Sequence, residues 1–319
     1  MIIEAHDLRK TFTVRRGPGK PVQVEAVRGI SLTVGEGEIF ACLGPNGAGK
    51  TTTVRMLATL ITPTSGTARV AGYDVVKQAA KVRERIGYVG QYGGIDEFAP
   101  GRVNLVMAGR LAGLSRAQAA ARADELMAAF RLTEVADRPV RTLSGGQKRR
   151  FALAVGLVHR PPLVFLDEPT TGLDPQNRAT LWEEIRALRD QGTSVLLTTH
   201  YLDEADALCD RLVIVDHGRI VAEGTPAALK KELAADVVTL RVDDPAAGRE
   251  LLEKQPYVTE TQQDGEGLRA YLEDGEHNLP ALLRAVENAG LAIRSIALER
   301  ATLDDVFLKY TGRSLRDAA

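Results

Sequence analysis

Three short, largely apolar runs mark the first two thirds of the chain. They span Ile39 to Leu43, Leu163 to Leu166 and Ser194 to Leu197, and turn-forming or polar residues bound each of them. Runs of this length without alternation are typical of strands buried on both faces of a parallel sheet. A helical pattern around Leu181 to Arg189 separates the second run from the third. The pattern therefore predicts an α/β core in which helices join parallel strands.

The segments around this core have different patterns. Residues 1 to about 40 consist of short strand-like stretches around a polar insertion, Arg15 to Pro21, which predicts an antiparallel β subdomain with a hairpin loop. Between about 102 and 130, leucines are spaced among good helix formers. We therefore expect an inserted helical subdomain at about residues 95–160.

Beyond Gly224-Thr-Pro226, strand-like and helix-like segments alternate. We predict a first domain over residues 1–229 and a small C-terminal α+β domain over residues 230–319, which has a dimerisation or regulatory role. The segments expected to form its elements are Val237 to Val242, Gly248 to Lys254, Leu268 to Leu272, Leu279 to Ala289 and Ile293 to Leu298.

Composition narrows the class of protein. The 319 residues are 44% hydrophobic and 26% charged, as in folded globular chains, and the net charge is −1 without a block of like charges. We therefore expect no nucleic-acid partner and interpret the densest basic run, Lys148-Arg149-Arg150, as a solvated helix face. Two cysteines, Cys42 and Cys209, fit a reducing cytoplasm. No stretch approaches the ~18 apolar residues of a membrane span, so any contact with a membrane needs a partner.

A glycine-rich segment, Gly44-Pro-Asn-Gly-Ala-Gly-Lys50-Thr51, follows the first apolar run and precedes a predicted helix over Thr52 to Leu60. In this order of strand, loop and helix, backbone N–H groups cradle phosphate oxygens at a helix N-terminus. Lys50 is expected to reach the β- and γ-phosphates, and the Thr51 hydroxyl a magnesium ion. The sequence thus predicts a nucleoside triphosphate site at Gly44, Pro45, Asn46, Gly47, Ala48, Gly49, Lys50, Thr51 and Thr52.

Two carboxylates, Asp167 and Glu168, follow the second apolar run directly. The carboxyl ends of parallel strands are where such sheets bind ligands. We expect Asp167 to help hold magnesium and Glu168 to polarise the water that attacks the γ-phosphate. The alternative interpretation is a solvated strand end.

A second small loop, Leu143-Ser144-Gly-Gly-Gln147, precedes a helical pattern that begins at Lys148. Ser144 and the two glycines can form another anion site at a helix N-terminus. Alternatively, Ser144 is an ordinary N-cap followed by flexible glycines.

These motifs, with Gln91, Gly172-Leu-Asp174 and His200, stand in the order seen in ATP-binding-cassette (ABC) ATPases, and the resemblance spans residues 4 to about 226. It implies a P-loop NTPase cassette with a mixed, mainly parallel sheet, an antiparallel β subdomain and a helical subdomain. It further implies that two copies close head to tail, each phosphate loop facing the partner's Ser144, Gly145, Gly146 and Gln147 across a shared ATP.

The resemblance also implies roles for single residues. Gln91 would touch magnesium and the attacking water, and His200 would donate to the γ-phosphate. Phe12 would stack on adenine, and Asp174 would bridge the two copies. The alternatives are a solvated Gln91, a core histidine at 200, a core phenylalanine at 12 and a helix N-cap at Asp174. During hydrolysis, Lys50, His200, magnesium and the partner's Ser144 loop would stabilise the developing charge.

Three further segments resemble the daunorubicin/doxorubicin-resistance type of ABC ATPase. They are Gly90-Gln-Tyr92, Thr170 to Asp174, and Leu303 to Leu308 followed by Thr311-Gly312. This type implies a separate membrane permease, a location at the cytoplasmic face of the cell membrane, and efflux of a hydrophobic drug or lipid. An amphipathic helix also explains the last pattern.

The chain departs from the family pattern at Ala99-Pro-Gly-Arg-Val-Asn104, where a hydroxyl is lost at Pro100 and a carboxylate at Val103. The resemblance places this segment against the membrane partner. The same motifs bear on two alternative functions. A nucleotide-gated clamp or assembly factor without transport uses the same cassette, whereas a kinase or GTPase has no place for the Leu143-to-Gln147 loop.

Overall fold

The chain divides into two compact units, and each is described by itself. The computed structural model describes residues 1–15, 21–91, 94–231, 233, 236–264 and 267–312. The division falls between Glu223 and Gly224, six residues before the predicted boundary after residue 229. Helix α8 (Pro226–Lys231) packs against α11 (Leu303–Thr311), the last helix, and so belongs to the second unit.

A six-stranded sheet forms the centre of the first unit, in the order β10-β9-β3-β8-β7-β6. Strands β9, β3, β8, β7 and β6 run parallel to one another. The three apolar runs of the sequence lie side by side as β3, β8 and β7 and are buried throughout, as the pattern predicts. The strands are β3 (Ile39–Leu43), β6 (Ile86–Val89), β7 (Leu163–Asp167), β8 (Ser194–Thr199), β9 (Arg211–Asp216) and β10 (Arg219–Gly224).

The N-terminal residues form an antiparallel sheet in the order β2-β1-β4-β5. Instead of several short strands, β1 (Ile3–Val14) and β2 (Val22–Val34) are two long ones, because register shifts after Ala5, Leu8 and Lys10 let the pair bend without ending. The predicted hairpin loop includes residues 16–20, which lie outside the described residues. Strands β4 (Ser65–Val70) and β5 (Tyr73–Asp74) complete the sheet.

Helix α1 (Lys50–Leu57) shares one hydrophobic core with both sheets. It begins two residues before and ends three residues before the predicted Thr52 to Leu60. Its Val54, Met56 and Leu57 are fully buried. The same cluster contains Ile3, Leu8 and Ile30 of the antiparallel sheet and Phe40, Phe165 and Leu196 of the central sheet.

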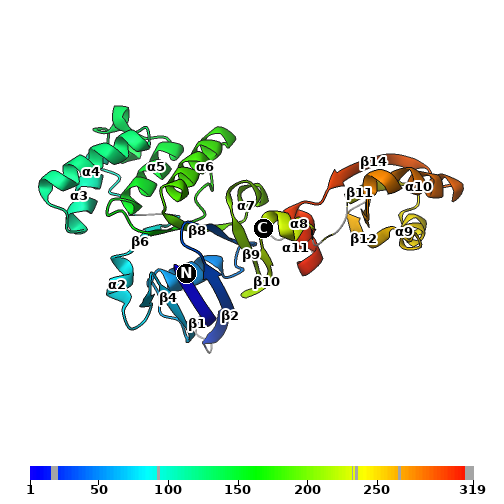
Figure 1. The fold of residues 1–319 in the computed structure, drawn as a ribbon, viewed down its shortest axis with the longest axis horizontal. Helices are drawn as coiled ribbons and strands as arrows, with labels where there is room; N and C mark the ends of the chain where they lie inside the picture. Colours follow the sequence, from blue (N-terminus) through cyan, green and yellow to red (C-terminus); the bar gives the residue numbers. More distant parts are fainter. Residues whose placement is uncertain (16–20, 92–93, 232, 234–235, 265–266, 313–319) are drawn as a thin grey trace. The chain divides into compact units, whose positions relative to one another are not determined.

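Three helices form the predicted helical subdomain: α3 (Gly101–Leu111), α4 (Arg116–Ala129) and α5 (Gly145–Gly156). The continuous pattern over 102–130 is broken between α3 and α4, where Ser115 and Gln118 form a capping box that starts α4. In Figure 1 these helices and α6 (Pro175–Asp190) lie on one side of the central sheet, and the antiparallel sheet lies on the other. Short helices α2 (Ala79–Arg83) and α7 (Leu202–Leu208) complete the unit.

The second unit is an antiparallel sheet, β12-β13-β11-β14, with helices, as predicted for a small α+β domain. Its core joins one sheet face to α9 and α10. The sequence pattern missed β12 because that strand is almost entirely polar. No helix among the described residues is long and apolar enough to span a membrane. The elements are β11 (Asp236–Val242), α9 (Pro245–Glu253), β12 (Val258–Asp264), β13 (Gly267–Leu272), α10 (Gly275–Asn288) and β14 (Ile293–Arg300).

Glu184 on α6 makes stability depend on pH. Both of its carboxylate oxygens are buried, and neither has a hydrogen-bond partner among the described residues. Burial raises the pKa of this carboxyl to about 7. The folded state therefore holds a proton that the unfolded chain releases near its ordinary pKa of about 4. The stability that this proton confers is complete below that pH and is lost as pH rises through about 7.

We predict that Glu184→Gln, which keeps a neutral side chain at every pH, gains thermal stability relative to the wild type as pH rises from about 5 to about 8. Melting temperatures across this range measure the difference. Glu134→Gln, at an exposed position whose charge is not among those that shift the pKa of Glu184, serves as the control and should show no such trend. A difference between Glu184→Gln and wild type that stays constant with pH would contradict the prediction.

Candidate active site

The loop between β3 and α1 places a lysine at the end of the central strand. Gly49 caps α1 in a left-handed conformation with φ of 105°, and a Cβ there would lie 2.5 Å from the Ala26 carbonyl oxygen of β2. Only glycine fits this position. The Lys50 ammonium is buried and donates to the carbonyls of Gly44, at 2.6 Å, and Pro45, at 2.9 Å. Gly44 to Gly49 thus form the loop, and Lys50, Thr51 and Thr52 form the first turn of α1.

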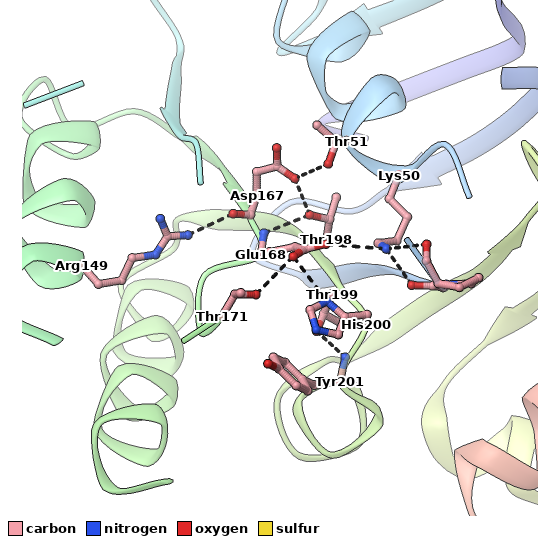
Figure 2. A network of polar contacts seen from close by, with 12 residues as sticks. Lys50, Thr51, Arg149, Asp167, Glu168, Thr171, Thr198, Thr199, His200 and Tyr201 are labelled. Carbon is pink, nitrogen blue, oxygen red and sulfur yellow. Dashed lines mark hydrogen bonds and ion pairs between the residues drawn. The ribbon is translucent and has the colours of Figure 1, made fainter. Parts of the chain in front are cut away.

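The carboxylate of Asp167, at the end of β7, ties three elements together. It is fully buried, and its Oδ1 accepts hydrogen bonds from the hydroxyls of Thr51, at 2.8 Å, and Thr198, at 2.7 Å. Its Oδ2 accepts a longer bond of 3.4 Å from the Tyr88 hydroxyl. Figure 2 shows Thr51 and Thr198 directed at this carboxylate from α1 and β8. The end of β7 is therefore not the solvated strand end of the alternative interpretation.

Glu168 follows in a left-handed backbone conformation, with φ of 47°, that turns its side chain into the site. Its N–H donates to the Thr198 hydroxyl at 3.0 Å. One carboxylate oxygen lies 3.7 Å from the Lys50 ammonium. The other accepts from the Thr171 hydroxyl at 3.2 Å and lies 3.3 Å from Nδ1 of His200 (Figure 2).

The charges around Glu168 keep it ionised. The neighbouring His200 ring contributes most to lowering the pKa of this carboxyl, and Lys50 adds to the effect, whereas burial opposes it. Burial also lowers the pKa of Lys50, and the charge of Glu168 opposes that shift. The pair thus presents one carboxylate and one ammonium side by side, with the carboxylate only 8% exposed.

His200 follows β8 and faces Glu168 rather than the protein core. Its side chain is 18% exposed, and its ring centroid lies 4.1 Å from that of Tyr201. A core histidine is therefore not what the structure shows. Behind it, Glu204 on α7 is fully buried and accepts from the indole N–H of Trp182 at 3.1 Å, which packs α7 against α6.

Arg149 corrects the interpretation of Lys148-Arg149-Arg150 as a solvated helix face. Its guanidinium donates to the backbone carbonyls of Gly90 at 2.7 Å, Pro169 at 2.7 Å and Asp167 at 3.1 Å (Figure 2 shows the contact with Asp167). No side-chain pattern in the sequence predicts these bonds, because every acceptor is a backbone carbonyl.

Ser144 starts α5 and is exposed. Its side chain accepts from the Gln147 N–H while the Gln147 side chain accepts from the Ser144 N–H, which is a capping box. Gly146 lies against Asn177, since a Cβ there would come within 2.5 Å of the Asn177 side-chain oxygen. The same Asn177 donates its N–H to Asp174, which caps α6. The N-cap readings of Ser144 and Asp174 are therefore correct.

A cavity of about 840 Å³ brings several of these residues together. Gln91 lines it from the exposed loop after β6, so its side chain is solvent-accessible, as the alternative interpretation holds. Arg149 lines the same space. The residues around the cavity include Asn46, Gln91, Gly145, Arg149, Glu168 and His200.

Phe12 is not among the residues that line this cavity. It is 38% exposed on β1, opposite Val24 of β2, so it is not the core phenylalanine of the alternative interpretation. The Lys10 ammonium lies 5.2 Å from the centre of its ring.

Comparison with known proteins agrees with this architecture. Residues 27–171 match the ABC transporter family, and residues 224–311 match the ATP-binding protein DrrA1-3-like C-terminal domain. The daunorubicin/doxorubicin resistance ATP-binding protein DrrA of Streptomyces peucetius is 48% identical over 92% of this chain and 89% of its own length. Nod factor export ATP-binding protein I of Paraburkholderia xenovorans is 44% identical over 91% of this chain and 93% of its own.

Among solved structures, an ATP-binding subunit of an ABC transporter superposes with a TM-score of 0.63 at 28% identity, covering 73% of this chain and 93% of that one. The chain belongs to the ATP-binding proteins of ABC transporters, and within them to the DrrA-like resistance type. It is thus an ATP-binding and ATP-hydrolysing subunit of an ABC exporter. These findings confirm the predicted fold class and family, and they do not favour a clamp without transport.

We predict that Gly49→Ala destabilises the nucleotide-free protein more than Gly47→Ala does. Both glycines have positive φ, which costs alanine about 1–2 kcal/mol. Only at Gly49 does the added Cβ also collide with backbone, whereas the space beside Gly47 is open. Denaturant unfolding should therefore show a free energy of unfolding at least about 1 kcal/mol lower for Gly49→Ala than for Gly47→Ala. Equal losses would mean that the close approach to β2 is unimportant.

Proposed function

We propose that Glu168 is the general base of ATP hydrolysis and that Lys50 and His200 contact the γ-phosphate. The observation that carries this proposal is the position of the Glu168 carboxylate between Lys50 Nζ, at 3.7 Å, and His200 Nδ1, at 3.3 Å. Because the surrounding charges lower its pKa, Glu168 is ionised at neutral pH and able to accept a proton from an attacking water. Lys50 and His200 then face the charge that develops on the phosphoryl group.

The oxygen atoms beside this carboxylate suit magnesium. Asp167 and Thr51 present a carboxylate and a hydroxyl 2.8 Å apart at the end of the phosphate loop, and both are hard oxygen donors. We assign these two residues, with Gln91 of the cavity lining, as the magnesium ligands. The ion would neutralise phosphate charge and orient the phosphates. Thr198, whose hydroxyl donates to the same carboxylate oxygen, keeps Asp167 in place before the ion binds.

Adenine stacking on Phe12 is supported by the pairing of β1 with β2. Phe12 lies opposite Val24, two residues before Ala26 on β2, and the Ala26 carbonyl lies against Gly49 of the phosphate loop. At about 3.3 Å per residue, the ring lies within a nucleotide's length of that loop. The nine residues Gly44 to Thr52 would hold the phosphates.

A second copy of the chain completes the site in this proposal. Ser144 is exposed, and the space beside Gly145 is open, so the N-terminus of α5 can receive a phosphate from another molecule. Ser144, Gly145, Gly146 and Gln147 would then close on the partner's ATP, and Asp174 would lie at the same interface. The second unit would hold the two copies together or regulate them.

An exposed apolar stripe on α3 supports docking on a membrane permease. Val103, Met107 and Leu111 recur every fourth residue, so they share one face of the helix, and they are 51%, 50% and 82% exposed. Phe98, before α3, is 77% exposed. Patches of this kind mark interaction sites. The chain would thus work at the cytoplasmic face of the cell membrane through this permease.

The two departures from the family pattern lie at this stripe. Pro100 caps α3 without a side-chain bond, and the buried Asn104 instead joins the segment by donating to the carbonyls of Asp96 and Pro100. Val103 replaces a carboxylate with an apolar side chain. The permease surface that meets it should therefore be apolar rather than basic. We propose a hydrophobic drug or lipid as cargo, in line with the names of the DrrA and Nod factor relatives.

We predict that Glu168→Gln binds ATP with affinity within about threefold of wild type and loses at least about 100-fold in turnover, because the amide cannot accept the proton. Calorimetric titration and phosphate release measure the two quantities. Glu183→Gln, on the exposed surface of α6, is the control. If Glu168→Gln hydrolyses ATP at the wild-type rate, Glu168 is not the general base.

A second prediction concerns the stripe. The experiment purifies an affinity-tagged chain from detergent-solubilised membranes. We expect a polytopic membrane protein to accompany the wild type. The double variant Met107→Glu and Leu111→Glu should lose this protein, because buried carboxylates are costly at an apolar interface. Leu60→Glu, at an apolar residue that is 51% exposed elsewhere, should keep it. Retention of the membrane protein by the double variant would place the docking face elsewhere.

A further inference from the structure

Arg149 connects three parts of the site that are far apart in sequence. It lies in the first turns of α5, and its guanidinium reaches the carbonyls of Gly90, Asp167 and Pro169 at 2.7, 3.1 and 2.7 Å. The three bonds use Nη1, Nη2 and Nε, that is, every nitrogen of the planar group. A half-buried guanidinium is stable only when its donors are satisfied, because it has lost part of its hydration, and this partial burial lowers the pKa of Arg149.

The three acceptor carbonyls all lie next to Glu168 or Gln91 in the chain. The Asp167 and Pro169 carbonyls lie on either side of Glu168, and the Gly90 carbonyl belongs to the peptide bond that begins Gln91. Glu168 itself has the left-handed conformation that side-chain-bearing residues avoid. Such a conformation persists only where neighbouring contacts over-determine it. Bonds to the carbonyls before and after Glu168 are contacts of that kind.

Lysine cannot replace this arrangement. Its ammonium is a single nitrogen on a flexible stem, whereas the guanidinium fork offers donors in fixed directions that match three separated acceptors. Arg122 of α4 offers a matched case at the other end of α5. From α4 it donates to the carbonyls of Leu157 and Val158, at 2.9 and 3.2 Å, just beyond the C-terminal end of α5. Neither carbonyl belongs to a residue beside Glu168 or Gln91.

We propose that Arg149 is a positioning residue for hydrolysis, which holds Glu168 and Gln91 in fixed relation to α5. Because Ser144 caps α5 at its N-terminus, the Arg149 side chain connects the exposed Ser144 loop with Glu168 of its own chain. Ser144 shifts when it meets the nucleotide bound to a partner. That shift is then transmitted to Glu168 of its own chain, which is the base of the site that holds its own nucleotide. This inference rests on the proposed role of Glu168.

The test compares Arg149→Lys with Arg122→Lys. If Arg149 positions the base, its variant binds ATP within about threefold of wild type in calorimetric titration and keeps its KM, but kcat falls by about 100-fold, as expected for a displaced catalytic group. Arg122→Lys, which loses the same kind of bonds, should keep kcat within about threefold. Equal losses of kcat in both variants, or a loss of ATP binding by Arg149→Lys, would overturn the proposal. If Arg149→Lys does not fold, Arg149→Gln, which retains a planar donor, takes its place.

A double-mutant cycle with Glu168→Gln separates this inference from the proposed function. If Arg149 acts through Glu168, adding Arg149→Lys to Glu168→Gln lowers the residual turnover by less than about threefold. A further fall near 100-fold would mean that Arg149 acts independently of Glu168 and would contradict the proposal. Wild-type turnover by Glu168→Gln alone would instead refute the base assignment, whatever Arg149 does.

Discussion

The buried carboxylate of Asp167 is the constraint on which the site depends. It accepts hydrogen bonds from Thr51 of α1 and Thr198 of β8, so α1 and the strands β7 and β8 meet at one oxygen atom. An ionised carboxylate this deep is costly unless donors surround it, and these hydroxyls supply them. Thr198 also accepts from the Glu168 N–H. The position of the next residue in the chain is therefore fixed by the same bonds.

The burial of Lys50 and Glu168 follows from that arrangement and has a cost of its own. Removing two charges from water is unfavourable, and a pair at 3.7 Å without direct hydrogen bonding does not recover that cost. Lys50 instead relies on the carbonyls of its own loop. A site that buries a loosely paired cation and anion is poorly optimised for stability. It is well prepared for a phosphate, which would meet Lys50 while Glu168 remains available to water.

Much of this could be predicted from the sequence, because it depends on side-chain patterns. The buried strands follow from three apolar runs, and Lys50, Asp167 and Glu168 gather because the ends of parallel strands share one edge of a sheet. The interpretation of Arg149 as part of a solvated helix face is wrong because its partners are backbone carbonyls, whose positions depend on the tertiary fold. β12 was missed because a polar strand gains its place from its neighbour β13 and not from its own pattern. The lengths of β1 and β2 depend on bulges that no residue type marks.

The exposed Ser144 explains why one chain is an incomplete enzyme on the proposed mechanism. Within the chain, Ser144 and Gln147 satisfy each other's backbone donors, so the loop is stable without a ligand. Gly146 and Asp174 both contact Asn177, which keeps the loop and the start of α6 in register. The half-site is therefore preorganised before a second copy arrives. Binding energy can then be used to bring the copies together around ATP. Hydrolysis would release them, because it cleaves the γ-phosphate from the nucleotide that both copies hold.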